Sequence, residues 1–419
     1  MSRWRWHIKQ IFERIWVRVT AFGVLGVVTA LSAAWMGRWV PEDLGVDVSA
    51  DAIESILEII ASSMLTVSTF SLSIMVSAFS AAQGSATPRA ITLLQSDRLT
   101  QHVLASFIGA FVYALVGIIA LETGIYGNSG RLVLFAVTIA VVAMIVIMLL
   151  RWVQHLSEFG RLEDTALRVE EATREALVMR AEDPVLGCCA WEEPPVGSWE
   201  LMAMRTGHVL HVDPAVLQEV AEDLGCRIWI LAQPGAFVHP GVGILRCDAL
   251  LEDAQARRQA EEALHEAFTI EQARSYEQDP EFGLRAMSEI ASRALSPAVN
   301  DPGTAIDILG RLMAVLGEWG QSRPKGEAPR CLRVMARELD PEALIRNAFD
   351  AIGRDGAGQI EVAIRLQDVL AGLARTEPRF AQPACAMAER AAALSQQAMV
   401  LSEDAQAVAA RAQELRAKL

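Results

Sequence analysis

The sequence lacks the residue patterns that mark several common chemistries. Its six cysteines have no paired zinc-finger spacing, so we expect reduced thiols and no bound metal. His208 and His211 lie three apart on a predicted strand, where odd spacing sends the two side chains to opposite faces. No G-x-S-x-G, H-E-x-x-H, P-loop or dinucleotide-binding fingerprint occurs in a suitable context. The sequence therefore predicts neither a cofactor nor an enzyme.

Basic residues are scarce in the C-terminal part of the chain. Residues 1–180 carry 14 of the 37 Lys and Arg and 15 of the 51 Asp and Glu, which leaves 23 and 36 for residues 181–419. Nucleic-acid phosphates are bound mainly through Lys and Arg. An acidic segment of this kind argues against a nucleic-acid partner.

Long apolar runs, by contrast, are concentrated in the first 155 residues. A helix that crosses a bilayer needs about 20 mostly apolar residues. Four runs meet this requirement, at residues 17–35, 56–79, 103–121 and 132–150. The first run is longer than the roughly 7–15 apolar residues of a signal peptide, so we expect it to be a retained anchor. We therefore predict a four-helix transmembrane domain over residues 1–155 that contacts the lipid bilayer.

The charges of the connecting loops predict the orientation of these spans. Basic residues precede the first span, and the loop that follows it, around residues 42–58, is acidic. Arg89 and Arg98 stand in the second loop, and Arg151 follows the fourth span. Because basic segments stay in the cytoplasm, both termini are expected to be cytoplasmic. The pattern indicates a multi-pass membrane protein.

The remainder of the chain is predicted to be mainly α-helical, with a small β-rich part. The helical pattern of the fourth span continues through residues 156–183, which we expect to form a stalk. Pro and Gly then mark a domain boundary near residues 183–198. We expect a β-rich module at 184–250 and a helical cytosolic domain at 251–419. Its helices are predicted at about 251–275, 281–294, 303–318, 341–352, 358–375 and 382–417.

The β-rich module contains strand-like runs around Gly-rich turns, in "CRIWILAQPGAFVHPGVGILRCD". A short helix at residues 214–224 with Asp213 as its cap is expected before them. The pattern resembles half of a barrel-sandwich hybrid domain, the small β fold of biotinyl and lipoyl carriers. Those carriers need a lysine, and none occurs between Lys9 and Lys325. The resemblance therefore implies a fold and no carried cofactor.

The run "YEQDPEFGLRAMSEIASRALSPAVNDPGTAIDILGRL", residues 276–312, predicts two helices around a turn. Asp279 and Asp301 each precede a proline and are expected to cap a helix. Pro297 should end the first helix, since the residue before a proline avoids helical dihedrals. The polar residues around the turn form either a binding motif or two helix caps that need no ligand. They are Arg293, Ser296, Asn300, Asp301 and Thr304.

This run resembles the signature of a bacterial family of predicted membrane proteins, domain of unknown function 2254. The segments "AAQGSATPRAI" after the second span and "TGHVLHVD" with "PGAFVHPG" agree with that family. The resemblance covers nearly the whole chain and implies four spans followed by a cytosolic domain. It implies no activity and no catalytic residue.

The second span contains nine Ser or Thr among nineteen residues, in "SSMLTVSTFSLSIMVSAFS", residues 62–80. At about 100° per residue, six of these hydroxyls fall within a stripe about 80° wide, and Glu58 extends the stripe toward the acidic loop. Ser63, Ser68 and Ser71 lie elsewhere on the helix. The stripe residues are Glu58, Ser62, Thr66, Thr69, Ser73, Ser77 and Ser80.

Two interpretations of this stripe stay open. Small hydroxylated residues allow membrane helices to pack closely. Hydroxyls can also line a pore, where Glu58 at the mouth would favour cations. Four helices cannot easily enclose a pore, so a channel or transporter would be a homo-oligomer with a cytosolic regulatory domain. The alternative is a membrane-anchored scaffold or sensor whose cytosolic domain binds a protein partner or a small ligand.

Overall fold

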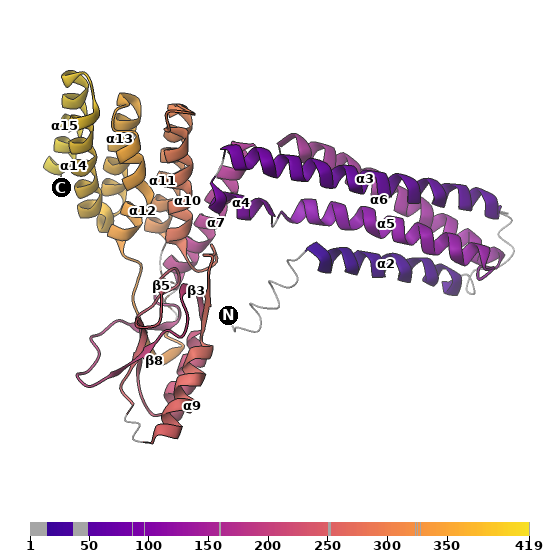
Figure 1. The fold of residues 1–419 in the computed structure, drawn as a ribbon, viewed down its shortest axis with the longest axis horizontal. Helices are drawn as coiled ribbons and strands as arrows, with labels where there is room; N and C mark the ends of the chain where they lie inside the picture. The colour runs from indigo at the N-terminus through magenta and orange to yellow at the C-terminus, as the bar shows by residue number, and fades with distance from the viewer. Residues whose placement is uncertain are drawn as a thin grey trace. The chain divides into compact units, whose positions relative to one another are not determined.

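The computed structural model describes residues 15–36, 49–85, 87–95, 97–158, 161–249, 253–322, 324, 326 and 328–418. The chain divides at Ala166 into an N-terminal unit of helices and a C-terminal unit of sheets and helices (Figure 1). The expected order of apolar helices, then strands, then mostly helices is confirmed.

Four long apolar helices form the N-terminal unit, together with the short helix α4 (Pro88–Gln95). They are α2 (Ile15–Met36), α3 (Ala50–Ser85), α5 (Arg98–Glu122) and α6 (Asn128–Glu158). Each contains one of the four predicted spans and is long and apolar enough to cross a membrane. Many of their apolar side chains are exposed, such as Phe70 and Leu150, which suits a lipid environment.

Helix α5 is the centre of this unit, because α2, α3 and α6 all pack on it. Glycines bring the backbones of α2 and α5 together. A Cβ atom at Gly26 would lie 2.6 Å from the carbonyl oxygen of Gly109, and one at Gly109 would lie 2.9 Å from that of Phe22. Small residues at such crossings allow the close approach that stabilises membrane helix pairs.

The C-terminal unit begins with α7 (Leu162–Glu182), of which Ala166 onward belongs to that unit. This helix occupies most of the expected stalk, residues 156–183. It packs against the helices that follow: a Cβ atom at Gly283 would overlap the side chain of Thr173. The segment is therefore an integrated part of the C-terminal unit.

The strands of the C-terminal unit form two sheets. The larger sheet has the order β1-β8-β4-β6-β2, with β8 parallel to β1 and β4 and the other pairs antiparallel. The smaller sheet has the antiparallel order β5-β3-β7. The strands are β1 (Cys188–Ala190), β2 (Trp199–Met202), β3 (Gly207–Val212), β4 (Ile228–Ile230), β5 (Phe237–Val238), β6 (Gly243–Cys247), β7 (Phe268–Glu271) and β8 (Cys331–Ala336).

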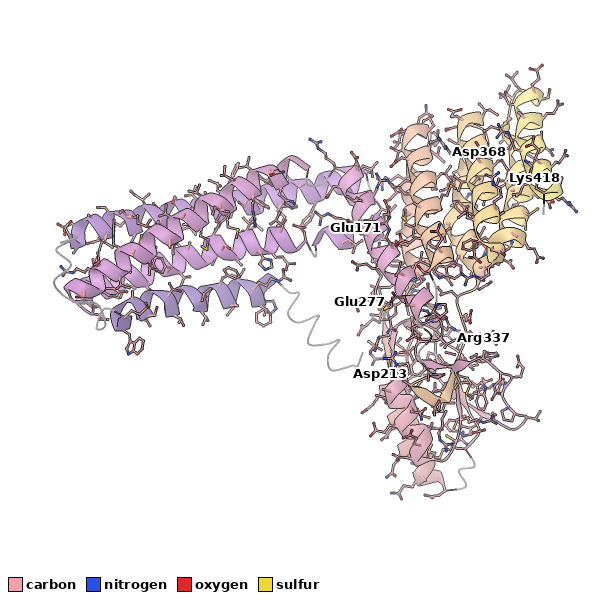
Figure 2. All side chains as sticks on the ribbon, turned by 180° about the vertical axis from the view of Figure 1, so that it is seen from behind. Glu171, Asp213, Glu277, Arg337, Asp368 and Lys418 are labelled. Carbon is pink, nitrogen blue, oxygen red and sulfur yellow. The ribbon has the colours of Figure 1, made fainter. Side chains whose placement is uncertain are left out.

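These sheets only partly match the expected β module. The described strands form no closed barrel, so the barrel-sandwich detail is not confirmed. Helix α8 (Pro214–Asp223) begins where predicted, after Asp213, which Figure 2 labels. The Asp213 side chain accepts a hydrogen bond of 3.2 Å from the backbone N–H of Ala215. A second helix, α9 (Ala254–Glu266), packs on α8. The apolar core of this part of the chain includes Leu217 of α8, Ile228 of β4 and Leu264 of α9.

Six helices complete the unit as three consecutive hairpins. In one row α10 (Pro280–Ala294) packs on α12 (Pro341–Asp355) and α12 on α14 (Ala381–Ala398). In the other, α11 (Pro302–Gln321) packs on α13 (Ile360–Thr376) and α13 on α15 (Ser402–Ala417) (Figure 1). A short 3₁₀ helix, η3 (Pro378–Phe380), joins α13 to α14.

Two features correct the all-helical domain expected over residues 251–419. First, β7 and β8 are strands, because each fills a place in a sheet whose other members come from earlier in the chain. Strand formation depends on such neighbours more than on local propensity. Second, the long helix expected at 382–417 is interrupted at Met399, where the backbone becomes extended. The break allows α15 to fold back against α14.

Candidate functional site

The hydroxyl stripe lies on the face of α3 that points away from the core of the N-terminal unit. Ile53, Leu57 and Met64 are buried in that core and lie roughly 180° around the helix from the stripe. The stripe therefore takes no part in the contact between α3 and α5. All seven predicted residues are exposed: Glu58, Ser62, Thr66, Thr69, Ser73, Ser77 and Ser80.

Large apolar side chains border the stripe on both sides. Ile59 and Phe70 lie along one edge and are 66% and 65% exposed. Leu65 and Val76 lie along the other edge, 51% and 55% exposed. The outer surface of α3 is thus a narrow polar band within an apolar surface. At the acidic end, the exposed Asp51 falls on the same face as Glu58, an addition that the sequence pattern did not single out.

The stripe hydroxyls donate hydrogen bonds to their own helix. The Oγ of Ser62 donates to the Glu58 carbonyl oxygen at 2.9 Å, and that of Ser73 to the Thr69 carbonyl oxygen at 3.0 Å. Thr66, Thr69 and Ser80 donate in the same way to the carbonyl one turn earlier. A hydroxyl that donates its proton inward leaves its oxygen lone pairs directed outward. The stripe therefore presents acceptors to its surroundings.

The other three hydroxyls of this segment behave differently. Ser68 is buried and donates to the Met64 carbonyl oxygen at 2.7 Å, and Ser63 is half-buried and bonds to the Ile59 carbonyl. Ser71 is buried in the face opposite the stripe. These residues act within the helix packing, so the two groups that the angular pattern separated also differ in burial.

A buried polar cluster in the N-terminal unit was not anticipated from the sequence. Asp97 caps α5 by accepting a 2.7 Å bond from the backbone N–H of Thr100. Its carboxylate also lies 3.0 Å from His155 Nε2, at the last turn of α6. The motif D-x-x-T predicts the cap, but His155 is 58 residues away and its approach depends on how α5 and α6 pack. The cluster joins the ends of two predicted spans.

The polar residues around the α10–α11 turn act mainly as caps. Asp301 accepts two bonds from Thr304, at 3.1 Å from its N–H and 2.6 Å from its hydroxyl. These bonds favour the carboxylate and lower the pKa of Asp301. Asn300 is exposed in a left-handed conformation, with φ of 50°, and its N–H donates to the Ser296 carbonyl oxygen at 2.8 Å. Arg293 lies in the last turn of α10.

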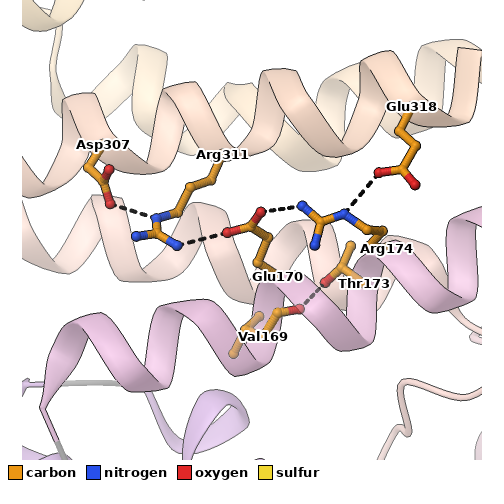
Figure 3. A network of polar contacts seen from close by, with 7 residues as sticks. All are labelled: Val169, Glu170, Thr173, Arg174, Asp307, Arg311 and Glu318. Carbon is orange, nitrogen blue, oxygen red and sulfur yellow. Dashed lines mark hydrogen bonds and ion pairs between the residues drawn. The ribbon is translucent and has the colours of Figure 1, made fainter. Parts of the chain in front are cut away.

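A chain of ion pairs links α7 to α11. Glu170 accepts from Arg311 at 2.8 Å and also pairs with Arg174, one turn along α7 (Figure 3). Arg174 continues to Glu318 at 2.9 Å, and Arg311 to Asp307 at 2.6 Å. These pairs raise the pKa of both arginines. The chain fixes α7 in the C-terminal unit and was not apparent from the sequence, since the pairs that join the two helices are 144 and 141 residues apart.

The described residues contain no group of three His, Cys, Asp or Glu that could hold a metal ion. His208 and His211 both lie on β3, but a bulge between Val209 and His211 shifts the strand register there. His211 is buried and His208 is half-buried. The two side chains therefore differ in burial.

Four helices of membrane-spanning length and a large C-terminal unit define an integral membrane protein. The chain matches the family model described as "Predicted membrane protein (DUF2254)" over residues 13–372, and it belongs to this family. The resemblance inferred from the sequence motifs is thereby confirmed.

Curated relatives match only a short segment. A stretch of 42 residues is 60% identical to uncharacterized proteins of Mycobacterium bovis and of two Mycobacterium tuberculosis strains. It covers 10% of this chain and 8% of each relative. No solved structure matches the chain.

Proposed function

We propose that this protein is a homo-oligomeric channel or transporter of the bacterial inner membrane, with its C-terminal unit in the cytoplasm as a regulatory domain. The exposed hydroxyl stripe of α3 is the observation that carries this proposal. In the assembly, α3 of each copy contributes its stripe to a shared water-filled path. We assign the protein no catalytic activity of its own.

Three properties of the stripe support a path for cations. Its hydroxyls direct lone pairs outward, and such acceptors can replace part of a cation's hydration shell. Glu58 and Asp51, both exposed, add negative charge at one end of the band. Anions would find no outward-directed donor among the five stripe hydroxyls that bond to their own helix.

The position of α3 explains why the path must form between copies. The stripe faces outward from the four-helix unit, so one chain cannot surround it. A closed ring of copies with α3 toward the axis would surround it and would bury the apolar borders against neighbouring helices. In the competing arrangement, the stripe packs directly against a helix of another copy, and no water lies along it.

Ion flux into liposomes tests this proposal. The purified wild-type protein is expected to pass monovalent cations faster than empty liposomes do. Glu58→Gln should lower the preference for cations over anions, because it removes a charge from the mouth. Glu122→Gln is the control, since Glu122 is also exposed but belongs to α5 rather than to the stripe. Flux equal to that of empty liposomes would contradict the proposal.

The second candidate function is that of a membrane-anchored scaffold or sensor whose cytosolic domain binds a partner or a small ligand. A cavity of about 380 Å³ in the C-terminal unit favours the small-ligand form of this function. It is within the range of about 300–1,000 Å³ that is usual for small-molecule sites.

A further inference from the structure

The cavity of about 380 Å³ is lined by four segments of the C-terminal unit. Arg180 of α7 and Trp319 of α11 contribute to its wall, as do Glu338 and Leu339 before α12 and Arg379 of η3. These segments are far apart in sequence and meet only in the folded unit. The site therefore could not be located from the sequence.

Arg180 is a buried cation without a carboxylate partner. The residue is 2% exposed, and no carboxylate oxygen lies within ion-pair distance of it among the described residues. Its Nη2 atom donates only to neutral acceptors: the carbonyl oxygens of Pro184 at 3.1 Å and Arg337 at 3.3 Å, and Gln233 Oε1 at 3.4 Å. Its Nε is buried without an acceptor.

The burial of such a charge is unfavourable unless an opposite charge compensates it. Burial lowers the pKa of Arg180 to about 10, although the more distant carboxylates of Asp183, Glu281 and Glu338 act in the other direction. The guanidinium is thus still charged at neutral pH. Its environment supplies hydrogen-bond acceptors but no neutralising partner in direct contact.

Trp319 contributes an aromatic ring to the wall of the same cavity. The guanidinium of Arg379 lies over this ring, 4.1 Å from its centroid. The wall therefore combines two guanidinium groups with an aromatic surface.

Two carboxylates also line the cavity, and neither forms an ion pair with Arg180. Glu377 is paired with Arg379 at 2.8 Å and also accepts from the Arg379 backbone N–H at 3.1 Å. Glu338 is exposed to solvent, unlike the buried Arg180. Arg180 is therefore the buried charge of the wall that has no oppositely charged partner in direct contact.

We propose that this cavity binds an oxyanion group, a carboxylate or a phosphate, carried by a small molecule. Arg180 supplies the opposing charge through its guanidinium group, and Trp319 supplies an aromatic wall beside the ligand. The inference rests on the second candidate function, a C-terminal unit that senses a small ligand, and it does not depend on ion flux.

Binding to the full chain in detergent tests this site. Inorganic phosphate and succinate are titrated at an ionic strength held constant with sodium chloride, with thermal unfolding and tryptophan fluorescence as readouts. We expect saturable stabilisation by at least one of the two anions beyond that of chloride. A response to phosphate alone identifies a phosphoryl ligand, and a response to succinate alone identifies a carboxylate ligand.

Variants separate a binding role of Arg180 from a purely structural one. Arg180→Met should weaken anion binding by about tenfold or more, because a charged hydrogen-bonding partner is lost. Trp319→Phe removes part of the aromatic wall and should weaken binding by a smaller factor, which provides the test if Arg180→Met does not fold. Arg346→Met is the control, since Arg346 is an exposed arginine of the same unit outside this cavity.

Two results would overturn the proposal. One is the absence of a saturable response to either anion. The other is wild-type affinity in both the Arg180→Met and the Trp319→Phe proteins, which would leave Arg180 as a residue that only bridges the Pro184 and Arg337 carbonyls. Neither readout involves transport, so a failure here is distinguishable from a failure of the channel proposal, and the reverse also holds.

Discussion

A serine that donates its proton to the carbonyl one turn back is tolerated next to lipid and still offers acceptors to a cation. This dual character explains why the hydroxyls of α3 can be exposed without destabilising the helix. It also explains why hydrogen bonding alone does not separate a pore from a helix seam. The presence of water beside Thr66 or Ser73 does separate them.

Asp301 offers a test of a single residue at the α10–α11 turn. Asp301→Ala should lower the free energy of unfolding of the C-terminal unit by about 1 kcal/mol at pH 7, because the N-cap of α11 is lost. Urea unfolding of the full chain, followed by circular dichroism, measures this change. Glu414→Ala, at an exposed site in α15, is the control and should change stability by less than about 0.5 kcal/mol.

The effect of Asp301→Ala should also depend on pH. The pKa of Asp301 is lower in the folded state, so its carboxylate stabilises the fold at neutral pH. That stabilisation is lost as the pH falls through the folded-state pKa. The difference between variant and wild type should therefore shrink in acid. A difference that grows as the pH falls would contradict the role assigned to this carboxylate.

At the scale of single residues, the sequence predicted on which face of a helix a residue lies but not which other helix that face contacts. The helical period sorted Ser62, Thr66 and Ser73 onto one face, because that sorting depends only on residue spacing. It could not show whether this face meets α5, since the packing partner is set by the other helices. The caps at Asp279 and Asp301 were predictable, because a cap is local chemistry.

At the scale of elements, glycine controls how closely α2 approaches α5. Gly26→Ala places a Cβ atom 2.6 Å from the Gly109 carbonyl oxygen, so the two helices must separate. We expect a loss of about 1–3 kcal/mol, seen as a lower unfolding temperature in detergent. Gly23→Ala, in the same helix with no atom within 4 Å of the new Cβ, should have no such effect. Equal unfolding temperatures for the Gly26→Ala and Gly23→Ala proteins would contradict this close contact between α2 and α5.

The ion-pair chain between α7 and α11 gives a second test of an element. Glu170→Ala leaves Arg174 and Arg311 without the carboxylate that they share (Figure 3). The expected cost is about 1–3 kcal/mol of unfolding free energy. Glu171→Ala, at the exposed neighbouring position labelled in Figure 2, serves as the control. If both variants unfold alike in urea, the chain contributes nothing measurable to the packing of α7.

At the scale of elements, the long helices were predicted from the sequence, whereas two short strands were not. The four apolar helices and most C-terminal helices followed from strong helical periodicity over many residues. The strands β7 and β8 were missed because each has few residues and is stabilised by partners elsewhere in the chain. The ion pairs of Glu170 and the cavity at Arg180 were missed for the same reason.

At the scale of the whole molecule, the exposed stripe predicts association between copies. A chain that functions as a monomer would leave a band of hydroxyls and Glu58 against lipid, which is an unfavourable place for a carboxylate. Sedimentation of the protein in detergent should therefore give a mass of more than one subunit. A monomer under conditions that preserve flux would contradict the arrangement proposed for α3.

Water accessibility of α3 tests the central claim most directly. Single cysteines are placed at Ser62, Thr66, Thr69 and Ser73 on the stripe and at Leu65 and Leu72 beside it, and labelled in membranes with a charged thiol reagent. Wild-type labelling of the native cysteines is the background. A water-lined path predicts fast labelling at the four stripe positions and slow labelling at Leu65→Cys and Leu72→Cys. Equally slow labelling at all six positions would contradict the pore.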